Sequence, residues 1–300
     1  MRRSFTGVVL GVTLMVMAGC GSDTEKGASA TAPSERTAAP SGATVVATIP
    51  SSAPQPASSS GDGTDAVNVV VIGDSLAGTG WVEMYRAGVE SKLGRPVRAE
   101  VLNGMTVPEA LQTVQSGPSH ETLASADIVI VETGFNNALP DPETGIGCGG
   151  NLSDFMIWIR STEPNCLAEG ITTYGSLYDG IFAGIKDVRA GKPTVFIATS
   201  TIDGNIDPET DGLVAAVAES DRPDALAWSL AAYERWNTML KERATEAGFT
   251  IVDLYHAFNG LDGTLPPGDL SKDGAHPSAK GDSLIAEMLS GVDLSILGGG

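Results

Sequence analysis

The sequence is poor in cysteine, histidine, aromatic residues and positive charge. It contains three cysteines and three histidines, its aromatic content is 5%, and 18 basic residues stand against 37 acidic ones, for a formal charge of −19. Non-specific nucleic-acid binding requires clustered Lys and Arg that neutralise phosphates. No such cluster occurs, and the scattered histidines offer no zinc-ligand spacing. We therefore expect no nucleic-acid partner and no metal.

Long apolar runs are also missing, apart from residues 7–18 near the N-terminus. That run is too short to cross about 30 Å of hydrocarbon, so a polytopic membrane protein is excluded. Apolar residues still make up 42% of the chain. This share permits one good-sized globular core, or two small ones, and excludes a wholly disordered protein.

The N-terminus has the order of features found in a signal peptide. Arg2 and Arg3 precede the apolar run, and residues 17–20 (Met-Ala-Gly-Cys) follow it. These four residues resemble a bacterial lipobox, in which the cysteine is acylated and becomes the first residue of the mature protein. The resemblance predicts a signal peptide over residues 1–19, a lipid on Cys20, and an exported protein anchored at the extracytoplasmic face of the membrane. An ordinary secretory signal, with Cys20 there by coincidence, is the alternative.

Residues 20–65 are rich in Ser, Ala, Thr, Pro and Gly and contain almost no large apolar side chains outside residues 44–49. Such a segment cannot bury enough surface to offset the loss of chain entropy, so we expect a disordered tether. The folded domain is expected over residues 66–293, as a monomer that the tether holds off the membrane.

Cys148 and Cys166 form an even pair in a chain that is expected to be exported. Oxidising surroundings make a disulfide between them the first expectation, and it would contribute about 3 kcal/mol to stability. Two free thiols or a partial metal site are the alternatives. Both cysteines lie in a stretch that we expect to be irregular, residues 137–173.

Buried β-branched runs alternate with helical patterns along the rest of the chain. Because the strands are apolar on both faces, they predict a parallel sheet that is covered on both sides, a three-layer α/β/α sandwich with five strands. The strands are expected at 67–72, 97–102, 127–131, 194–198 and 249–254, and the helices at 81–93, 107–115, 177–190, 224–247 and 277–289. Ligands of such sheets bind at the carboxyl ends of the strands.

Ser75 stands in Gly-Asp-Ser-Leu, directly after the first expected strand and before a helix. This position would expose its hydroxyl at the ligand-binding edge, with a helix N-terminus directed at any anion that forms there. A simple N-cap serine in a strand-to-helix turn is the alternative explanation.

Asp273 and His276 are three residues apart in a loop before the last expected helix. Across such a turn a carboxylate can reach the imidazole Nδ1 and fix the tautomer whose Nε2 accepts a proton from a serine. A polar loop in which His276 merely caps a helix is the alternative.

Together these motifs resemble the SGNH, or GDSL, hydrolase family. The match consists of Gly-Asp-Ser-Leu at 73–76, Gly-Phe-Asn at 134–136 and Asp273 to His276, and their order and strand context agree from about residue 67 to residue 289. The resemblance implies a flavodoxin-like fold and a serine hydrolase that cleaves carboxylic esters without a cofactor. Small-molecule, lipid and acylated-sugar esters all remain open as substrates.

The resemblance also assigns roles residue by residue. Ser75 corresponds to the nucleophile, His276 to the general base and Asp273 to its orienting carboxylate. The Ser75 backbone N–H, the Asn136 side-chain amide and the Gly104 backbone N–H correspond to the oxyanion hole. Gly104 follows the second strand at the right place, although the segment after it is shorter than the usual glycine-rich pattern.

At position 137 the chain has Asn where the family usually has Asp, a position with no role in the triad, so we expect activity to survive. Two other functions stay open for the same residues: a cell-envelope acyltransferase and a ligand-binding protein without turnover. The segment 137–173, with the apolar residues 155–159, is hypothesised to form part of a wall or lid over the acyl pocket, pinned by Cys148 and Cys166, or else a small satellite core. The segment 203–207 opens like a calcium loop but lacks its later ligands, so we interpret it as a solvated acidic loop.

Overall fold

The computed structural model describes residues 66–134, 136, 165–207 and 218–298. The signal peptide, the tether, Cys20, Cys148, the side chain of Cys166 and the hypothesised lid at 155–159 lie outside the described residues. Those expectations therefore stay predictions.

Five parallel strands form one sheet in the order β2-β1-β3-β4-β5. Four of them are short runs of mostly β-branched residues, which suits a pleated layer buried on both faces, whereas the edge strand β2 contains Arg98 and Glu100 and is largely exposed. The fold class predicted from the sequence is confirmed. The strands are β1 (Val67–Gly73), β2 (Val97–Asn103), β3 (Ile128–Glu132), β4 (Val195–Thr199) and β5 (Thr250–Val252).

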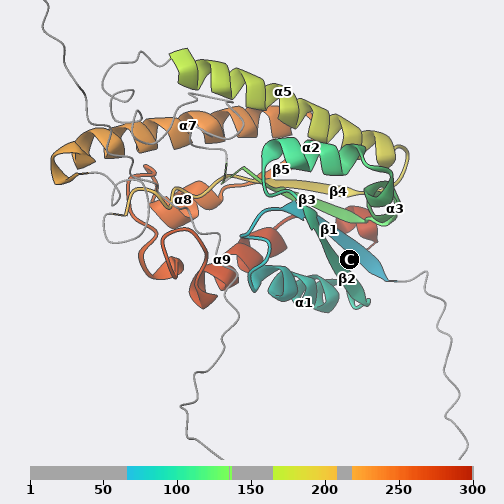
Figure 1. The fold of residues 1–300 in the computed structure, drawn as a ribbon. Helices are drawn as coiled ribbons and strands as arrows, with labels where there is room; N and C mark the ends of the chain where they lie inside the picture. Colours follow the sequence, from blue (N-terminus) through green and yellow to red (C-terminus); the bar gives the residue numbers. More distant parts are fainter. Residues whose placement is uncertain (1–65, 135, 137–164, 208–217, 299–300) are drawn as a thin grey trace, which may run out of the picture. The chain divides into compact units, whose positions relative to one another are not determined.

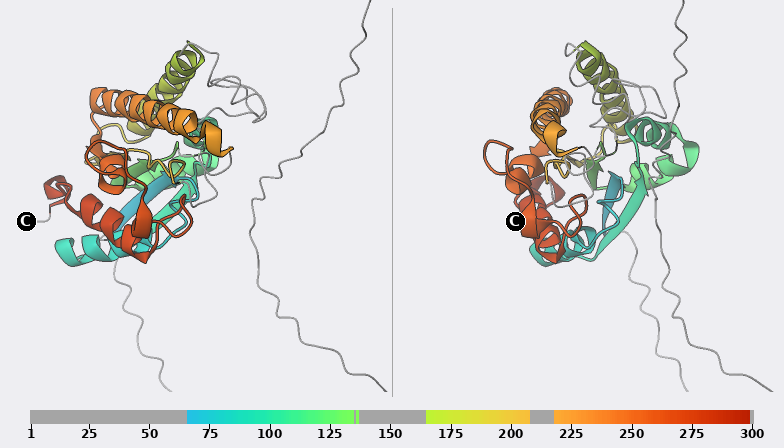
Figure 2. Two further views of the ribbon diagram at one scale, coloured as in Figure 1. Left: turned by 90° about the vertical axis from the view of Figure 1, so that its left-hand side faces the viewer. Right: turned by 60° about the vertical axis from the view of Figure 1, so that its left-hand side comes forward.

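Helices cover both faces of this sheet (Figure 1). On one side lie α2 (Val107–Gln115), α3 (Gly117–Ser125), α5 (Asn165–Val188) and α7 (Arg222–Glu246), and on the other lie α1 (Trp81–Leu93) and α9 (Ala279–Ser290). A short helix, α8 (Leu254–Asn259), follows β5. The turned views separate the same two helical layers (Figure 2). Within the described part of the chain, no helix is long and apolar enough to cross a membrane.

The two faces of β1 pack into two separate apolar clusters. Val70 and Ile72 face α2, α5 and α7, whereas Val69 and Val71 face α1 and α9. Successive side chains of a strand point to opposite faces, so this alternation follows directly from the pleat. Strand β1 is thereby packed on both sides, and its carboxyl end holds the turn that follows Gly73 in place.

Three expected boundaries were wrong. The fifth strand, expected to reach residue 254, ends at Val252, because α8 begins at Leu254. The stretch 137–173, expected to be irregular, is helical from Asn165, where α5 begins. The last helix begins at Ala279, not at Pro277, because the Ser278 hydroxyl caps it by accepting the Gly281 N–H at 3.3 Å. Pro277 instead pairs with Ser271 in an isolated antiparallel bridge that closes the loop between them.

Candidate active site

Ser75 lies just past the carboxyl end of β1, half-buried, in a series of tight turns. The Ala77, Gly78 and Thr79 N–H groups each donate to the carbonyl three residues earlier. The helix expected at 81–93 is α1, and residues 76–80 separate Ser75 from its N-terminus. The turn still exposes one donor: the Ser75 N–H makes no hydrogen bond to any described residue, whereas the Leu76 N–H is taken by the Asp74 carboxylate at 2.9 Å.

The loop from Ser271 to Pro277 holds the imidazole of His276 in one orientation. Asp273 Oδ1 accepts the backbone N–H of Ala275 at 3.0 Å and of His276 at 2.7 Å, and its Oδ2 lies 2.9 Å from His276 Nδ1. The His276 carbonyl accepts the Lys272 N–H at 3.0 Å. Backbone and side chain of His276 are thus both bound within the loop.

These hydrogen bonds also set the charge on Asp273. Partial burial acts to raise the pKa of this carboxyl, but the two backbone N–H groups and the imidazole outweigh it and hold the pKa below its ordinary value. Asp273 is therefore ionised at neutral pH and accepts the proton on Nδ1, which leaves Nε2 as the acceptor.

The two segments meet although 201 positions separate them in sequence. His276 Nε2 lies 3.0 Å from Ser75 Oγ. Carboxylate, imidazole and hydroxyl are thereby linked in series by hydrogen bonds of 2.9 and 3.0 Å. This arrangement can move a proton from the hydroxyl to the imidazole while the carboxylate stabilises the imidazolium that results.

Asp282, on α9, joins the serine turn to the helix that follows the histidine loop. Its carboxylate accepts the Thr79 hydroxyl at 2.7 Å and the Gly80 N–H at 3.1 Å. Each oxygen therefore has one partner on the segment between Ser75 and α1. The contact fixes that segment relative to α9, which begins three residues after His276.

Asn136 follows β3 and reaches across to the segment after β2. Its Nδ2 donates to the Met105 carbonyl at 2.6 Å, which leaves the second amide hydrogen for a ligand. Gly134, just before it, has φ +130°, and a Cβ there would lie 2.5 Å from the Tyr178 hydroxyl. Only glycine allows the chain to turn at this point, so Gly134 places Asn136 at the edge of the sheet.

Gly104 does not fit its expected role as an oxyanion donor. Its N–H donates to the Gly73 carbonyl at 2.9 Å, which extends the pairing of β1 and β2 by one residue past Asn103. An N–H held in this ladder is not available to a ligand. The glycine instead allows the backbone after β2 to approach the end of β1 closely, since a Cβ at position 104 would lie 3.0 Å from the Gly73 nitrogen.

The comparisons with known proteins agree with this geometry. Residues 71–284 match the sequence profile of the GDSL-like lipase/acylhydrolase family. The chain belongs to this family. Membership makes it a carboxylic ester hydrolase, and the matched region extends from β1 into α9.

Solved structures of the same fold are only distantly related in sequence. A lipase from a goat rumen metagenome is 17% identical, with a TM-score of 0.54, over 75% of this chain and 97% of that one. A putative GDSL-like lipase from Parabacteroides merdae is 16% identical, with a TM-score of 0.50, over 77% of this chain and 95% of that one. At these identities the likeness establishes the fold. No curated protein gave a match.

A buried acid, Glu132, lies beneath the serine turn of this family member and was not singled out from the sequence. It ends β3 opposite Gly73, and its carbonyl accepts the Asp74 N–H at 3.2 Å. Burial, together with the negative charge of Asp74, raises the pKa of Glu132 well above its ordinary value. This shift opposes the formation of a second negative charge under Ser75. The only sequence signal is an acid at the end of an otherwise apolar strand.

Two asparagine side chains hold the segment after β4 as a neighbouring strand would. Asn237 accepts the Thr201 N–H at 2.7 Å and donates to the Thr201 carbonyl at 2.9 Å. Asn259 does the same for Asp203, at 2.9 and 2.8 Å. The segment continues to Gly204, where a Cβ would lie 1.9 Å from the Gly274 carbonyl. These four hydrogen bonds therefore fix this backbone next to the loop that carries His276.

Asp203 is 0% exposed, so the expectation of a solvated loop at 203–207 was wrong. Its carboxyl accepts the Asn205 N–H at 3.0 Å and the Ser229 hydroxyl at 3.0 Å, and it forms no ion pair with a described residue. Burial raises its pKa to about 7, in spite of these two hydrogen bonds. The described residues contain no group of acidic, histidine and cysteine side chains that could hold a metal ion.

A second Asp–His pair with the same spacing, Asp253 and His256, occurs after β5. His256 Nδ1 lies 2.7 Å from Asp253 Oδ2. The nearby Ser200 hydroxyl donates to Asp253 at 3.1 Å and accepts the Tyr255 N–H at 2.8 Å, so it does not bond the imidazole. This pair reproduces the acid and the base without a serine.

We predict that Asp203→Asn stabilises the protein more at high pH than at low pH. The native carboxyl keeps its proton up to about pH 7, whereas the unfolded one loses it near pH 4. The free energy of unfolding of the wild type therefore falls as the pH rises through that window, and the amide removes this loss. Thermal unfolding at pH 5 and pH 8 should show the gain in Tm increasing by at least about 4 °C.

The matched control is Asp187→Asn, which removes an exposed carboxyl on α5. It changes the net charge equally and should shift the Tm by the same small amount at both pH values. An equal shift for Asp203→Asn at both pH values would show that Asp203 is ionised throughout.

Proposed function

We propose that Ser75 is the nucleophile of a two-step ester hydrolysis with His276 as general base. The observation that carries this proposal is the 3.0 Å contact between His276 Nε2 and Ser75 Oγ, with Asp273 on the other side of the ring. In the first step Nε2 takes the hydroxyl proton while Oγ bonds to the ester carbonyl carbon. The tetrahedral intermediate then collapses, the alcohol leaves with the proton from His276, and the acyl group remains on Ser75.

Water completes the cycle by the same route. His276 removes a proton from water, the hydroxide attacks the acyl carbonyl, and Ser75 leaves with the proton to restore the free enzyme. In both steps the oxyanion would be held by the Ser75 N–H and the second Nδ2 hydrogen of Asn136, without Gly104. Asp273 fixes the tautomer and stabilises the imidazolium but does not itself take the proton.

We also propose that the enzyme acts outside the cytoplasm as a lipid-anchored monomer on small-molecule, lipid or acylated-sugar esters. Arg2, Arg3 and the lipobox-like residues ending at Cys20 support the anchor. The polar, proline-containing residues 20–65 would let the hydrolase domain reach substrates at a distance from the membrane.

We predict that Ser75→Ala and His276→Ala each lower kcat for p-nitrophenyl esters by more than about 10³-fold, because either change breaks the proton transfer. The measurement is steady-state and burst kinetics on the purified protein, with circular dichroism to confirm folding. Turnover that persists in Ser75→Ala would refute the assignment of the nucleophile.

The matched control for His276→Ala is His256→Ala. Both substitutions remove an imidazole whose Nδ1 is bound by an aspartate three residues earlier, but only His276 contacts a serine hydroxyl. We expect His256→Ala to retain kcat within about twofold. A comparable loss in both variants would mean that the effect reflects general disturbance of this sheet edge.

We predict that Asn136→Ala lowers kcat by about 10²- to 10³-fold with little change in KM. The amide would act on charge that develops only in the transition state, as expected for an oxyanion donor. Kinetics on one ester at several concentrations separates kcat from KM. A rise in KM at unchanged kcat would instead make Asn136 a residue for ground-state binding.

The anchor has its own prediction. Mass spectrometry of the mature N-terminus from bacterial membranes should find an acylated Cys20 as the first residue, and Cys20→Ala should leave the leader uncleaved or the protein unacylated. An unmodified mature N-terminus at another position would contradict the anchor and leave the hydrolase assignment untouched.

A further inference from the structure

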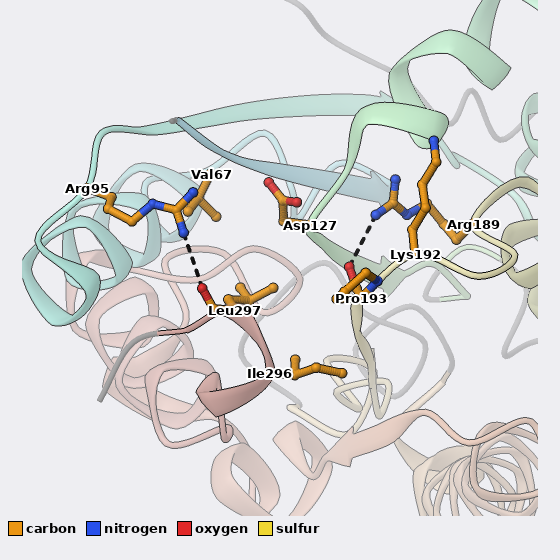
Figure 3. Close-up of a pocket in the computed structure, with 8 residues that line it drawn as sticks. All are labelled: Val67, Arg95, Asp127, Arg189, Lys192, Pro193, Ile296 and Leu297. Atoms are coloured by element: carbon orange, nitrogen blue, oxygen red, sulfur yellow. Dashed lines mark hydrogen bonds between the residues drawn. The ribbon is translucent and has the colours of Figure 1, made fainter. Parts of the chain in front are cut away.

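A hollow of about 350 Å³ lies at the amino-terminal edge of the sheet (Figure 3). Val67 is the first residue of β1, and Asp127 directly precedes β3. The remaining lining residues are Arg95, Arg189, Lys192, Pro193, Ile296 and Leu297. Since Ser75 follows the other end of β1, seven residues of strand, or about 20 Å, separate this hollow from the candidate active site.

The lining is positively charged in a strongly acidic protein. Three cationic side chains and one carboxylate line the hollow, whereas the whole chain carries a formal charge of −19. Figure 3 shows the guanidinium groups of Arg95 and Arg189 on opposite sides, with the Asp127 carboxylate between them. The Asp127 carboxylate is hydrogen-bonded to the backbone, because its Oδ2 accepts the Asn68 N–H at 2.9 Å.

Arg189 is a buried cation beside the hollow. Its side chain is only 4% exposed and forms no ion pair with a described residue. It donates from Nε to the Thr194 hydroxyl at 2.8 Å and from Nη2 to the Pro193 carbonyl at 3.3 Å, and Nη1 donates to the Ala124 carbonyl. A guanidinium has five donors, so two remain. Burial lowers the pKa of Arg189, and the nearby Asp127 opposes this only in part.

Two of the three cations that line the hollow cap α3, and the third comes from another segment. Arg189 and Lys192 both donate to the carbonyl of Ala124, near the C-terminal end of α3, where cations are favourable. Arg95 comes from the turn between α1 and β2 and donates to the Leu297 carbonyl at 3.2 Å. Its guanidinium lines the hollow on the side opposite Arg189.

We propose that the hollow binds a compact anion, a phosphate or carboxylate group with a short apolar portion, between Arg95 and Arg189. The planar guanidinium groups suit these oxyanions, and Ile296, Leu297 and Pro193 offer an apolar wall beside them. The same chemistry occurs in free anions and in the head groups of anionic lipids. This site is independent of ester hydrolysis at Ser75.

The first experiment titrates the full chain with inorganic phosphate and with hexanoate, at constant ionic strength so that general screening does not change. Calorimetry should show one saturable site for at least one of these anions. Arg95→Gln should raise the dissociation constant by at least about tenfold, the loss of affinity expected for one charge-assisted contact. Arg189→Gln tests the buried partner, and its folding is checked by circular dichroism.

The matched control is Arg235→Gln, which removes one positive charge from an exposed position on α7. It should leave the dissociation constant unchanged. Equal weakening in Arg95→Gln and Arg235→Gln would show that the anion responds only to net charge, and it would overturn the proposal.

A second arm distinguishes the two sources of the anion. Sedimentation with phosphatidylglycerol vesicles, against phosphatidylcholine vesicles, compares wild type, Arg95→Gln and Arg235→Gln, which share the same N-terminus. Vesicle binding that only Arg95→Gln loses identifies a lipid head group, whereas Arg95-dependent binding confined to the soluble anions identifies a free anion. If neither arm shows binding that depends on Arg95, the proposal is overturned. Ester hydrolysis, measured in parallel, should be unchanged in every variant.

Discussion

The arrangement of the site depends on one carboxylate, that of Asp282. Ser75 and His276 lie near opposite ends of the domain sequence, and the 3.0 Å contact between them tolerates little error. The parallel sheet brings their segments to the same edge, but a sheet alone does not fix the loops beyond its strands. By binding Thr79 and Gly80 from α9, Asp282 ties the serine turn to the helix that begins directly after the histidine loop.

The two edges of the sheet differ in their electrostatics. At the carboxyl edge, burial raises the pKa values of Glu132 and Asp203, whereas hydrogen bonds hold the pKa of Asp273, beside the histidine, below its ordinary value. At the amino edge, Arg189 is a buried cation without an ion pair among the described residues. Burial thus opposes ionisation of Glu132 and Asp203 at the edge that carries Ser75, where further negative charge would oppose an oxyanion.

The first strand and the histidine loop could be predicted, because each depends on residues that are close together in the sequence. The β-branched run before Gly73 and the three-residue spacing of Asp273 and His276 were sufficient to place the strand and the loop. The burial of Asp203 was not predictable, because it depends on Asn259 and Ser229, which come from two other helices. The bond from the Gly104 N–H to Gly73 likewise depends on how far β2 pairs with β1 before it turns away, and no local pattern encodes that distance.

Covalent labelling of Ser75 tests the central claim most directly. A fluorophosphonate reacts with a serine hydroxyl that a neighbouring base activates, and peptide mass spectrometry then locates the adduct. The account predicts one adduct per chain, on the peptide that contains Ser75, and none in His276→Ala. An adduct on Ser200 or another serine, or none on a folded and fully exported protein, would contradict it.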